Sequence, residues 1–428
     1  MNFDPFDAKL ADEPYPAYRA LRNQDALHWS TEGKVFCVTR FDEAEAVFKQ
    51  PELFSSAIGF NLLINSSWET IGVRDVLEMV RFMFRAHMNP LVLRNAPSTI
   101  ISSDPPQHGP LRNTVNRGFT PRRISAWEKR VREISEECMI GAGDEPCFDV
   151  VDKLAAPLPM RIIAEMLGVD TDRLADFRRW STGLIDIISG SGRTNSPAHS
   201  LAMAGELFRY LRTVVEARRK APTDDLISVL VDPTQGVAMS TQEVIFFALV
   251  VLVAGNETTM NTVGSATELL MRRRDVLEEV ADDPSLIPNL VEEIIRMESP
   301  FRFMPRTAVQ DTTIRGTHIP KGSDLLIMIG AANRDERRFE NPDHFDLHRD
   351  TAGHLGFGYG IHFCLGASLA RLEARVVLET LVPLLLDREL RSGGAIRTDS
   401  FFTRGYSRIE VTRVGASSAL GAWEHQAV

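Results

Sequence analysis

One long apolar helix is the sequence feature that most constrains the fold. It begins at the capping-box pattern Ser240-Thr-Gln-Glu243, and its helical periodicity continues to residue 270. The same 3.6-residue period dominates the rest of the chain, whereas strand patterns are few and short. We therefore expect a mainly α fold with a minor β region. Helices are predicted at 41–49, 123–140, 154–167, 171–188, 200–219, 240–270, 285–298 and 365–387. Strands are predicted at 26–30, 34–40, 312–329 and 401–413.

Composition and charge are those of a soluble globular protein. Of the 428 residues, 44% are hydrophobic and 25% are charged, and the net charge of −10 argues against nucleic acid as the main partner. Four cysteines without a CxxC pair indicate a reducing compartment. The N-terminus lacks the order of a signal peptide, and the longest uncharged apolar run, 244–254, is too short for a bilayer. We expect a cytoplasmic protein without a transmembrane segment, folded as a single domain over residues 1–428, with surface loops at 189–199 and 392–396.

A lone cysteine lies in the glycine-rich loop GFGYGIHFCLG, residues 356–366. Because residue 363 is Phe, the loop fails the G-x-G-x-x-G pattern of dinucleotide sites, and it has too few Cys or His ligands for zinc. It also lacks an obvious base that would activate Cys364 as a nucleophile. An amphipathic helix follows directly, so the helix dipole is expected to lower the pKa of the Cys364 thiol. Two interpretations remain open from these residues: a buried structural thiol, and a thiolate ligand of haem iron under a flat macrocycle.

The segment Phe357–Gly366 matches F-G-x-G-x-H-x-C-x-G at every fixed position, and it resembles the haem-binding signature of the cytochrome P-450 family. Other family marks occur in the expected order over nearly the whole chain. The resemblance implies the family's triangular prism of helices around a buried haem b, with the Cys364 thiolate as the axial iron ligand. It also implies further cofactor contacts from Phe357, Gly358, His362 and Gly366.

A polar interruption, Ala254-Gly-Asn-Glu-Thr-Thr259, breaks the long apolar helix. Gly255 costs the helix about 1 kcal/mol relative to alanine, which close approach of a ligand would offset. The stretch is similar to the family's oxygen-binding groove, which implies that Ala254 and Gly255 lie over the haem iron. The same resemblance makes Glu257 and Thr258 catalytic residues: Thr258 orients the activated dioxygen, and Glu257 helps to deliver protons for O–O cleavage. A threonine that bonds back to its own helix remains the alternative.

Two further sets of charged residues match the family. Glu293 and Arg296 lie three apart on one helical face, and the family pattern adds Arg349 to form a buried network with a structural role. The two haem propionates require partners, and guanidinium–carboxylate contacts are strong and directional. By resemblance, these partners are His108, Arg112, Arg306 and His362.

The resemblance also implies an electron donor and a substrate pocket. The donor is expected to be a ferredoxin-type iron–sulfur protein with its reductase, docked on a local basic surface. The arginines of this basic surface are Arg112, Arg117, Arg122, Arg123, Arg371 and Arg375. The pocket is expected to be lined by Val250, Val253, Ala254, Phe301, Phe303, Met304 and Phe402. No residue is a dedicated anchor for a charged substrate, although Arg302 and Arg404 could serve as one. The helical segment 74–94, within the long stretch 56–103, is either a lid over the pocket or a surface helix with one buried face.

Together these features favour a haem-thiolate monooxygenase that uses O2 to hydroxylate an apolar small molecule of terpenoid, steroid or fatty-acyl type. The acid–alcohol pair Glu257 and Thr258 favours dioxygen over peroxide as the oxidant. Three alternatives remain open: a peroxide-using enzyme of the same fold, an enzyme that rearranges an oxidised substrate, and a non-catalytic haem-thiolate protein that binds a small ligand.

Overall fold

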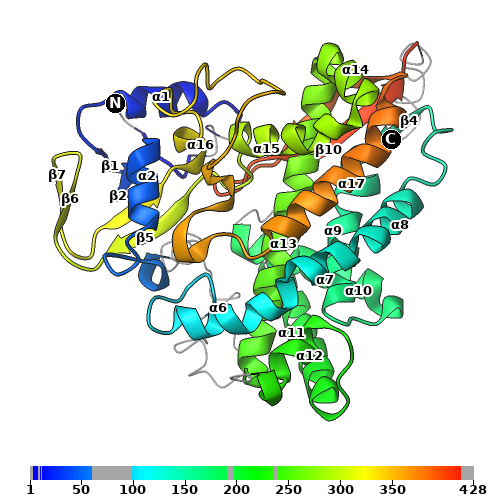
Figure 1. The fold of residues 1–428 in the computed structure, drawn as a ribbon, viewed down its shortest axis with the longest axis horizontal. Coiled ribbons are helices and arrows are strands. Elements are labelled where there is room, and N and C mark those ends of the chain that lie inside the picture. Colours follow the sequence, from blue (N-terminus) through cyan, green and yellow to red (C-terminus); the bar gives the residue numbers. More distant parts are fainter. Residues whose placement is uncertain are drawn as a thin grey trace.

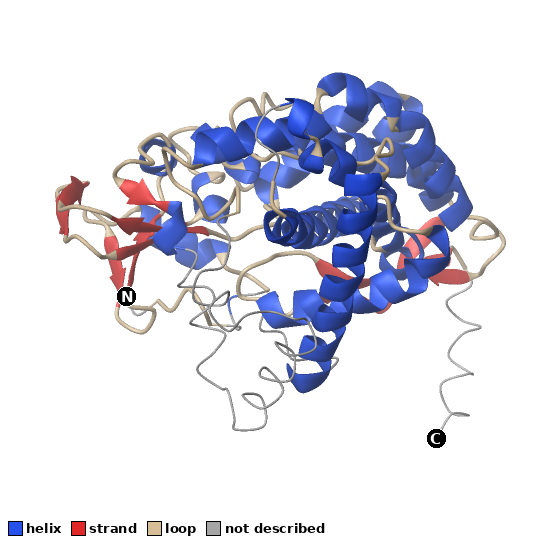
Figure 2. Cartoon of the chain, turned by 90° about the horizontal axis from the view of Figure 1, so that it is seen from below, coloured by secondary structure: helices blue, strands red, loops and turns tan. Residues whose placement is uncertain are grey.

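The computed structural model describes residues 3–7, 10, 12–59, 99–189, 197–235 and 239–415. Helices make up most of the molecule, which has a roughly triangular outline (Figure 1), and the strands lie at two ends of the helical body (Figure 2). The helices are α1 Tyr15–Arg22, α2 Phe41–Phe48, α6 His108–Asn116, α7 Pro121–Ala126, α8 Glu128–Cys138, α9 Pro157–Met166, α10 Leu174–Ser189, α11 Pro197–Lys220, α12 Leu226–Val231, α13 Thr241–Arg272, α14 Arg274–Asp282, α15 Ile287–Met297, α16 Ile329–Ala332 and α17 Ala367–Leu385. The strands are β1 His28–Ser30, β2 Val35–Val38, β3 Phe54–Ser55, β4 Cys147–Asp149, β5 Met304–Ala308, β6 Thr312–Ile314, β7 Thr317–Ile319, β8 Asp324–Ile327, β9 Arg388–Arg397 and β10 Tyr406–Arg413.

The long helix α13 crosses the middle of the molecule (Figure 1). Both halves of its capping box form, because the Glu243 N–H donates to Ser240 Oγ at 3.3 Å and the Ser240 N–H donates to Glu243 Oε2 at 2.7 Å. By length and apolar composition α13 could cross a membrane. However, α13 contacts α9, α11, α15 and α17. A helix that is packed in the protein core has the same apolar composition.

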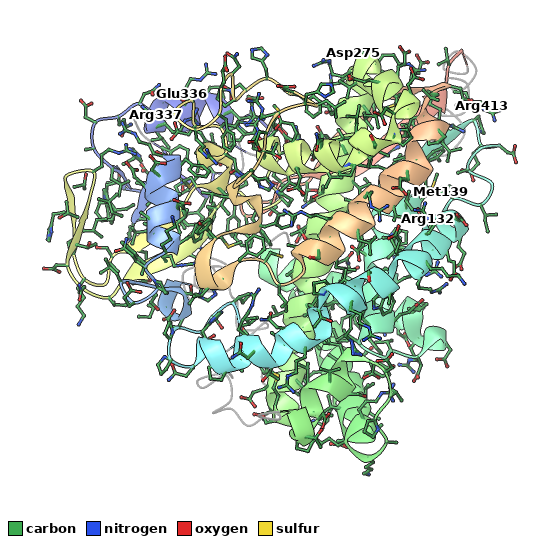
Figure 3. The ribbon with its side chains drawn as sticks, in the orientation of Figure 1. Arg132, Met139, Asp275, Glu336, Arg337 and Arg413 are labelled. Carbon is green, nitrogen blue, oxygen red and sulfur yellow. The ribbon has the colours of Figure 1, made fainter. Side chains whose placement is uncertain are left out.

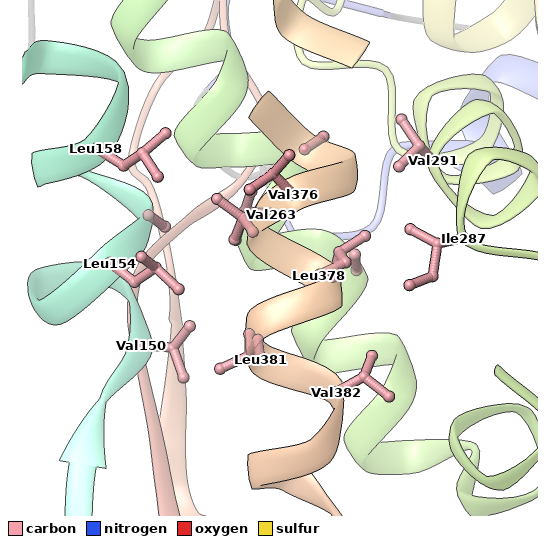
Figure 4. Packing of buried hydrophobic residues seen from close by; sticks show 14 of the residues in the cluster. Val150, Leu154, Leu158, Val263, Ile287, Val291, Val376, Leu378, Leu381 and Val382 are labelled. Carbon is pink, nitrogen blue, oxygen red and sulfur yellow. The ribbon is translucent and has the colours of Figure 1, made fainter. Parts of the chain in front are cut away.

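A large hydrophobic cluster fixes α17 against α13 and α9 (Figure 4). Leu154, Leu158, Val263, Val376 and Leu381 are members with no exposed surface. Each such side chain contributes about 1.5–3 kcal/mol through burial. This packing matters for the site because the N-terminus of α17 carries the Cys364 loop, while the middle of α13 carries the polar interruption.

Two sheets connect parts of the chain that are distant in sequence. The first has the order β1-β2-β8-β5-β3, with β2 parallel to β8 and the other neighbours antiparallel, so it joins residues 28–55 to residues 304–327. The second has the order β4-β10-β9 and is antiparallel. Strands β6 and β7 form a separate hairpin.

The predicted helices are largely found, with some differences in detail. The predicted helix 123–140 divides at Trp127 into α7 and α8. The predicted surface loop 392–396 is wrong: these residues belong to β9, where Ala395 pairs with Ile409 and Ile396 with Arg408. A register shift in the ladder and a φ of 69° at Gly393 accommodate the Gly-Gly pair within the strand.

The remaining short elements α1, α12, α14, α16, β3, β4, β5 and β9 were not expected from the sequence. The candidate lid 74–94 and residues 190–196 of the other predicted loop lie outside the described residues. Charged side chains such as Asp275, Glu336 and Arg413 lie at the periphery of the structure (Figure 3), as expected for a globular protein in water.

Candidate active site

The Cys364 loop leads into α17 and is closed by its own backbone. The Cys364 N–H donates to the Phe357 carbonyl oxygen at 2.8 Å. Gly360 has a φ of 68°, and a side-chain carbon there would lie 2.6 Å from the Phe48 carbonyl oxygen at the end of α2, so this position needs glycine for the packing of the protein itself. At Gly366 a side-chain carbon would meet no described atom within 4 Å. The backbone beside Cys364 is therefore open to a bulky group.

Burial dominates the titration of Cys364. It raises the pKa of the thiol, while the Gly366 N–H and the guanidinium groups of Arg112 and Arg371 lower it to a smaller extent. The expectation that the helix N-terminus would give a low pKa is wrong for the protein chain by itself, because burial outweighs the Gly366 N–H and the two arginine charges. Metal coordination reverses this balance, since a coordinating thiol is deprotonated. In the chain alone, the raised pKa of the Cys364 thiol argues against a reactive free nucleophile.

The four predicted propionate partners lie together next to the Cys364 loop. The rings of His108 and His362 are 4.5 Å apart between centroids. Arg112 Nη1 donates to the Phe363 carbonyl oxygen at 2.8 Å, and His362 Nε2 lies 3.0 Å from Ser56 Oγ. This arrangement brings residues from α6, β5 and the Cys364 loop into one cluster.

The electrostatics of this cluster suit an anion. Burial lowers the pKa of Arg306 to about 10, and burial together with Arg306 and His108 lowers the pKa of His362 to about 3. Burial and the Arg112 charge also lower the pKa of His108, whose buried Nε2 has no hydrogen-bond partner among the described residues. The arginines therefore supply the positive charge, and the two imidazoles are neutral at pH 7 and act as hydrogen-bond donors or acceptors.

The polar interruption of α13 forms one continuous helix with the apolar residues around it. A side-chain carbon on Gly255 would lie 2.7 Å from Cδ1 of Ile163 in α9, so close helix packing contributes to the need for glycine here. Thr258 Oγ1 donates to the Ala254 carbonyl oxygen at 2.6 Å, which is the back-bonding alternative left open by the sequence. A hydroxyl that donates in this way keeps its lone pairs free to accept a hydrogen bond.

Glu257 is buried, with 8% of its surface exposed. Burial raises the pKa of its carboxyl, and a hydrogen bond from Thr403 lowers it to a smaller extent. Thr403 Oγ1 donates to Glu257 Oε1 at 2.6 Å. Sequence reasoning missed Thr403, because no local pattern links it to a residue 146 positions earlier.

The predicted pocket residues fall into two groups. Val250, Val253, Phe301 and Met304 keep partial exposure, and the ring of Phe402 lies 4.9 Å from that of Phe301 between centroids. Phe303 is different. It has no exposed surface and packs against Phe6, Phe401 and Phe402. Phe303 therefore belongs to the core behind the pocket wall, and its assignment to the lining is wrong.

Arg302 and Arg404, the candidate substrate anchors, are both buried and engaged within the protein. Arg302 donates to the Phe401 carbonyl oxygen at 3.1 Å, and Arg404 Nε donates to Glu298 Oε2 at 2.8 Å. Glu298 also binds Arg334 and Arg397 and accepts a hydrogen bond from Tyr15. The two arginines thus hold the C-terminal part of the chain in place and do not serve as anchors for a charged substrate.

The predicted structural network is assembled as expected. Arg296 donates to both oxygens of Glu293, at 2.6 and 2.8 Å, and Arg349 Nε donates to Glu293 Oε1 at 3.0 Å. Arg296 also donates to the carbonyl oxygens of Asn333 and Pro342. The network joins α15 to the irregular segment that precedes the Cys364 loop. Because Glu293 and Arg296 have no exposed surface, removing one partner would leave a buried charge.

Several arginines of the predicted basic surface are neutralised by neighbouring carboxylates. Arg123 pairs with Asp224, Arg371 binds Glu292 at 2.6 and 2.9 Å, and Arg375 pairs with Glu128 and Glu379 at 2.8 Å each. Arg117 and Arg122 have no carboxylate within 4.0 Å in the part of the chain that the structure describes. The basic surface is therefore weaker than six arginines in the sequence suggest.

Comparison with known proteins identifies the family. The family model described as cytochrome P-450 matches residues 199–384. A Vitamin D(3) 25-hydroxylase from Pseudonocardia autotrophica is 34% identical over 424 residues, which cover 97% of each chain. A cytochrome P-450 structure from Chondromyces apiculatus has a TM-score of 0.82 at 34% identity, covering 96% of this chain and 98% of its own. An enzyme from Bacillus megaterium, solved with testosterone, has a TM-score of 0.79 at 28% identity, covering 94% of this chain and 99% of its own. This chain belongs to the cytochrome P-450 family and is a monooxygenase with the family's fold.

Proposed function

We propose that this monooxygenase holds haem b through the Cys364 thiolate and hydroxylates an uncharged, apolar molecule of steroid type. The observation that carries the proposal is the convergence of Cys364 with two arginines and two neutral histidines in one cluster. The overall reaction balances as RH + O2 + 2 electrons + 2 protons giving ROH + H2O. The electrons come from a redox partner, and the protons pass through residues of this chain.

The cluster fits the two carboxylates of haem. The guanidinium of Arg306 is buried and donates a hydrogen bond to the neighbouring Pro305 carbonyl oxygen at 2.7 Å, and no described carboxylate lies within 4.0 Å of it. His108 Nε2 likewise needs a partner. Two propionates would satisfy both groups, with Arg112 and His362 as the other contacts. When bound, thiolate-ligated haem supplies the activation of dioxygen.

The remaining cofactor contacts come from the Cys364 loop and α13. The Phe357 carbonyl oxygen accepts a hydrogen bond from the Cys364 N–H, and the Phe357 ring packs against the Arg371 guanidinium, whose carbon lies 4.3 Å from the ring centroid. Gly358 and Gly366 leave the backbone free of side-chain bulk on this side. We assign Ala254 and Gly255 of α13 to the residues that would contact the haem.

Glu257 and Thr258 are the proton-handling residues of the proposal. Because burial raises the pKa of Glu257, its carboxyl holds a proton more firmly than an exposed glutamate does. Thr258 donates to the Ala254 carbonyl oxygen and can accept a hydrogen bond at the same oxygen atom. The pair provides a proton source and a hydroxyl relay in an otherwise apolar stretch. Glu257 and Thr258 are consecutive residues of α13, so their side chains leave the helix on neighbouring sides.

The substrate class follows from the lining and from the relatives. Phe301, Met304 and Phe402 offer an aromatic and apolar wall, and Arg302 and Arg404 are already engaged. One relative is named for vitamin D(3) and another was solved with testosterone. A rigid, uncharged sterol-like skeleton therefore suits this pocket better than a carboxylate of the fatty-acid type. Terpenoids share the same chemistry and are the next class to test.

The electron donor in this proposal is a ferredoxin-type iron–sulfur protein with its reductase, in the cytoplasm. Its docking surface is centred on Arg117 and Arg122, since other arginines nearby are paired with carboxylates. Arg122→Glu should slow reduction of the haem by the donor at low salt. Unchanged reduction kinetics would contradict the proposed docking surface. We also infer a single domain over 1–428, which is supported by sheets that join residues 28–55 to 304–327 and residues 147–149 to 410–412.

Spectroscopy tests the cofactor first. The reduced protein with carbon monoxide should give the red-shifted Soret band of thiolate-ligated haem, and Cys364→Ser should lose it. A preparation that binds no haem would overturn the proposal. Testosterone, vitamin D(3) and a terpene alcohol are then screened by the Soret shift and by product formation with a surrogate ferredoxin system.

A single variant separates the possible oxidants. Thr258→Ala should still consume reductant but release more peroxide and less product, which is the signature of impaired proton delivery. A peroxide-driven or rearranging enzyme would keep its turnover in this variant. A ligand-binding protein would form no product in either form.

A further inference from the structure

The C-terminal turn, residues 398–405 between β9 and β10, lies along the catalytic stretch of α13. Thr403 contacts Glu257, and a side-chain carbon on Gly405 would overlap the side chain of Asn261. Farther on, Tyr406 packs next to Gly264. Residues 257, 261 and 264 share one face of α13 because their spacing is four and three. Successive residues of the chain from 403 to 406 therefore pack against successive positions along this face of α13.

Among the described residues, the Thr403 hydroxyl donates a hydrogen bond to the buried carboxyl of Glu257. Both side chains are buried, with 8% of Glu257 and 2% of Thr403 exposed, and the two oxygen atoms are 2.6 Å apart. Among the described residues, no arginine, lysine or histidine forms an ion pair with Glu257. A single neutral donor thus determines how this carboxyl is oriented.

The same turn is tied to the wall of the proposed substrate pocket. The Arg302 N–H donates to the Phe402 carbonyl oxygen at 2.9 Å, and the Arg404 N–H donates to the Pro300 carbonyl oxygen at 2.9 Å. Phe301 and Thr403 form an isolated antiparallel bridge. Thr403 and Phe402 are neighbours in one short, hydrogen-bonded turn. The Phe402 ring and the Thr403 hydroxyl are therefore carried by the same hydrogen-bonded backbone segment.

We propose that Thr403 is a positioning residue for Glu257: it fixes the direction of the buried carboxyl and links proton supply to occupancy of the pocket wall at Phe402. The inference rests on the proposed role of Glu257 in proton delivery. Glu257 gives up its carboxyl proton and regains one from solvent, so the step needs no further reactant. Thr403 neither gains nor loses a proton in this process.

The test compares two hydroxyl deletions in one turn. Thr403→Val removes the donor and keeps the shape of the side chain, and Thr403→Ser keeps the hydroxyl. Thr398→Val is the matched control, because the buried Thr398 hydroxyl has no hydrogen-bond partner in the described structure. Thr403→Ala provides a second variant without a donor. Haem-loaded enzyme is used throughout, and its carbon monoxide spectrum confirms an intact site.

The first readout needs no substrate. The infrared band of the Glu257 carboxyl, identified by its loss in Glu257→Gln, should move in Thr403→Val and Thr403→Ala and stay in place in Thr403→Ser and Thr398→Val. The second readout is peroxide released per electron pair from a surrogate ferredoxin, with testosterone present. Loss of one hydrogen bond of this kind predicts a rise of about three- to tenfold in the two variants without a donor.

The outcomes separate this inference from the proposed function. An unmoved carboxyl band in Thr403→Val, with peroxide release equal to that of Thr398→Val, would overturn the positioning role. Unchanged peroxide release in Glu257→Gln itself, with the thiolate haem spectrum intact, would instead overturn the role of Glu257 in proton delivery. A moved band with raised peroxide in the donor-free variants, restored by serine, would support the inference.

Discussion

Replacing Glu298 by glutamine should lower the free energy of unfolding by about 3 kcal/mol at neutral pH, and the loss should shrink on acidification. Glu298 ends α15 and binds guanidinium groups from three parts of the chain, at 3.2 Å for Arg334, 2.9 Å for Arg397 and 2.8 Å for Arg404. Tyr15 of α1 donates a hydrogen bond to the same carboxyl at 3.0 Å. The variant keeps the size of the side chain and removes its charge.

The magnitude follows from the titration of this carboxyl. Burial opposes its ionisation, but the charges of Arg404, Arg397 and Arg334 outweigh burial and lower the pKa of Glu298 from 4.5 to about 2. At about 1.4 kcal/mol for each factor of ten, this difference corresponds to about 3 kcal/mol. The Glu298 side chain is 17% exposed, so solvent screening reduces the value little. Because the folded pKa is depressed, the stabilisation is complete above pH 4.5 and is lost as the pH falls toward 2.

Urea unfolding of the wild type and of Glu298→Gln, at pH 7 and at pH 3.5, measures this effect. The destabilisation by the variant should be about 3 kcal/mol at pH 7 and about 2 kcal/mol at pH 3.5. Glu136→Gln, at an exposed position on α8, is the control and should leave stability unchanged at both values. A loss below about 1 kcal/mol at pH 7, or a loss that does not depend on pH, would refute the reasoning.

Three further changes test the site and its support. Gly360→Ala should destabilise the protein by about 1–3 kcal/mol and lower its haem content, because the new carbon would lie 2.6 Å from the Phe48 carbonyl oxygen at a φ of 68°; thermal unfolding equal to the wild type would contradict this. Arg306→Gln should speed haem transfer to an acceptor protein about tenfold, whereas Arg122→Gln should not. Burial raises the pKa of Glu373 to about 8, so Glu373→Gln should gain up to about 3 kcal/mol of stability over the wild type between pH 4.5 and 7; urea midpoints at pH 4.5 and 7 measure it, and a constant difference would count against it.

Local patterns predicted the long helix well because the interactions that form it act within one turn. Ser240 and Glu243 cap α13 across three residues, and the apolar period that follows is read directly from the sequence. The same local reasoning failed at 392–396, where Ser and Gly suggested a loop. These residues form a strand because β10, about a dozen residues later, pairs with them. Tertiary pairing overrode local preference there.

The site shows the same division between local and distant information. Cys364, His362 and Gly360 lie in one short loop, so a motif can reveal them together. The hydrogen bond from Thr403 to Glu257 joins residues 146 positions apart. Arg404 suggested a substrate anchor because its carboxylate partner Glu298 lies 106 positions away. No spacing rule can show that such a charge is already satisfied.

The buried arginines themselves distinguish structural support from a ligand site. Arg296 and Arg404 each bind a carboxylate of the chain, and burial of these pairs is tolerable because their charges are compensated. Arg306 is equally buried, yet its pKa is lowered to about 10, and the described chain offers it no carboxylate within 4.0 Å. A buried guanidinium is expensive unless an anion neutralises it. Arg306 therefore carries a buried positive charge beside His362 of the Cys364 loop that no described carboxylate compensates. In the proposed function a haem propionate compensates it, so Arg306→Gln should weaken haem binding and leave the ion pairs of Arg296 and Arg404 in place.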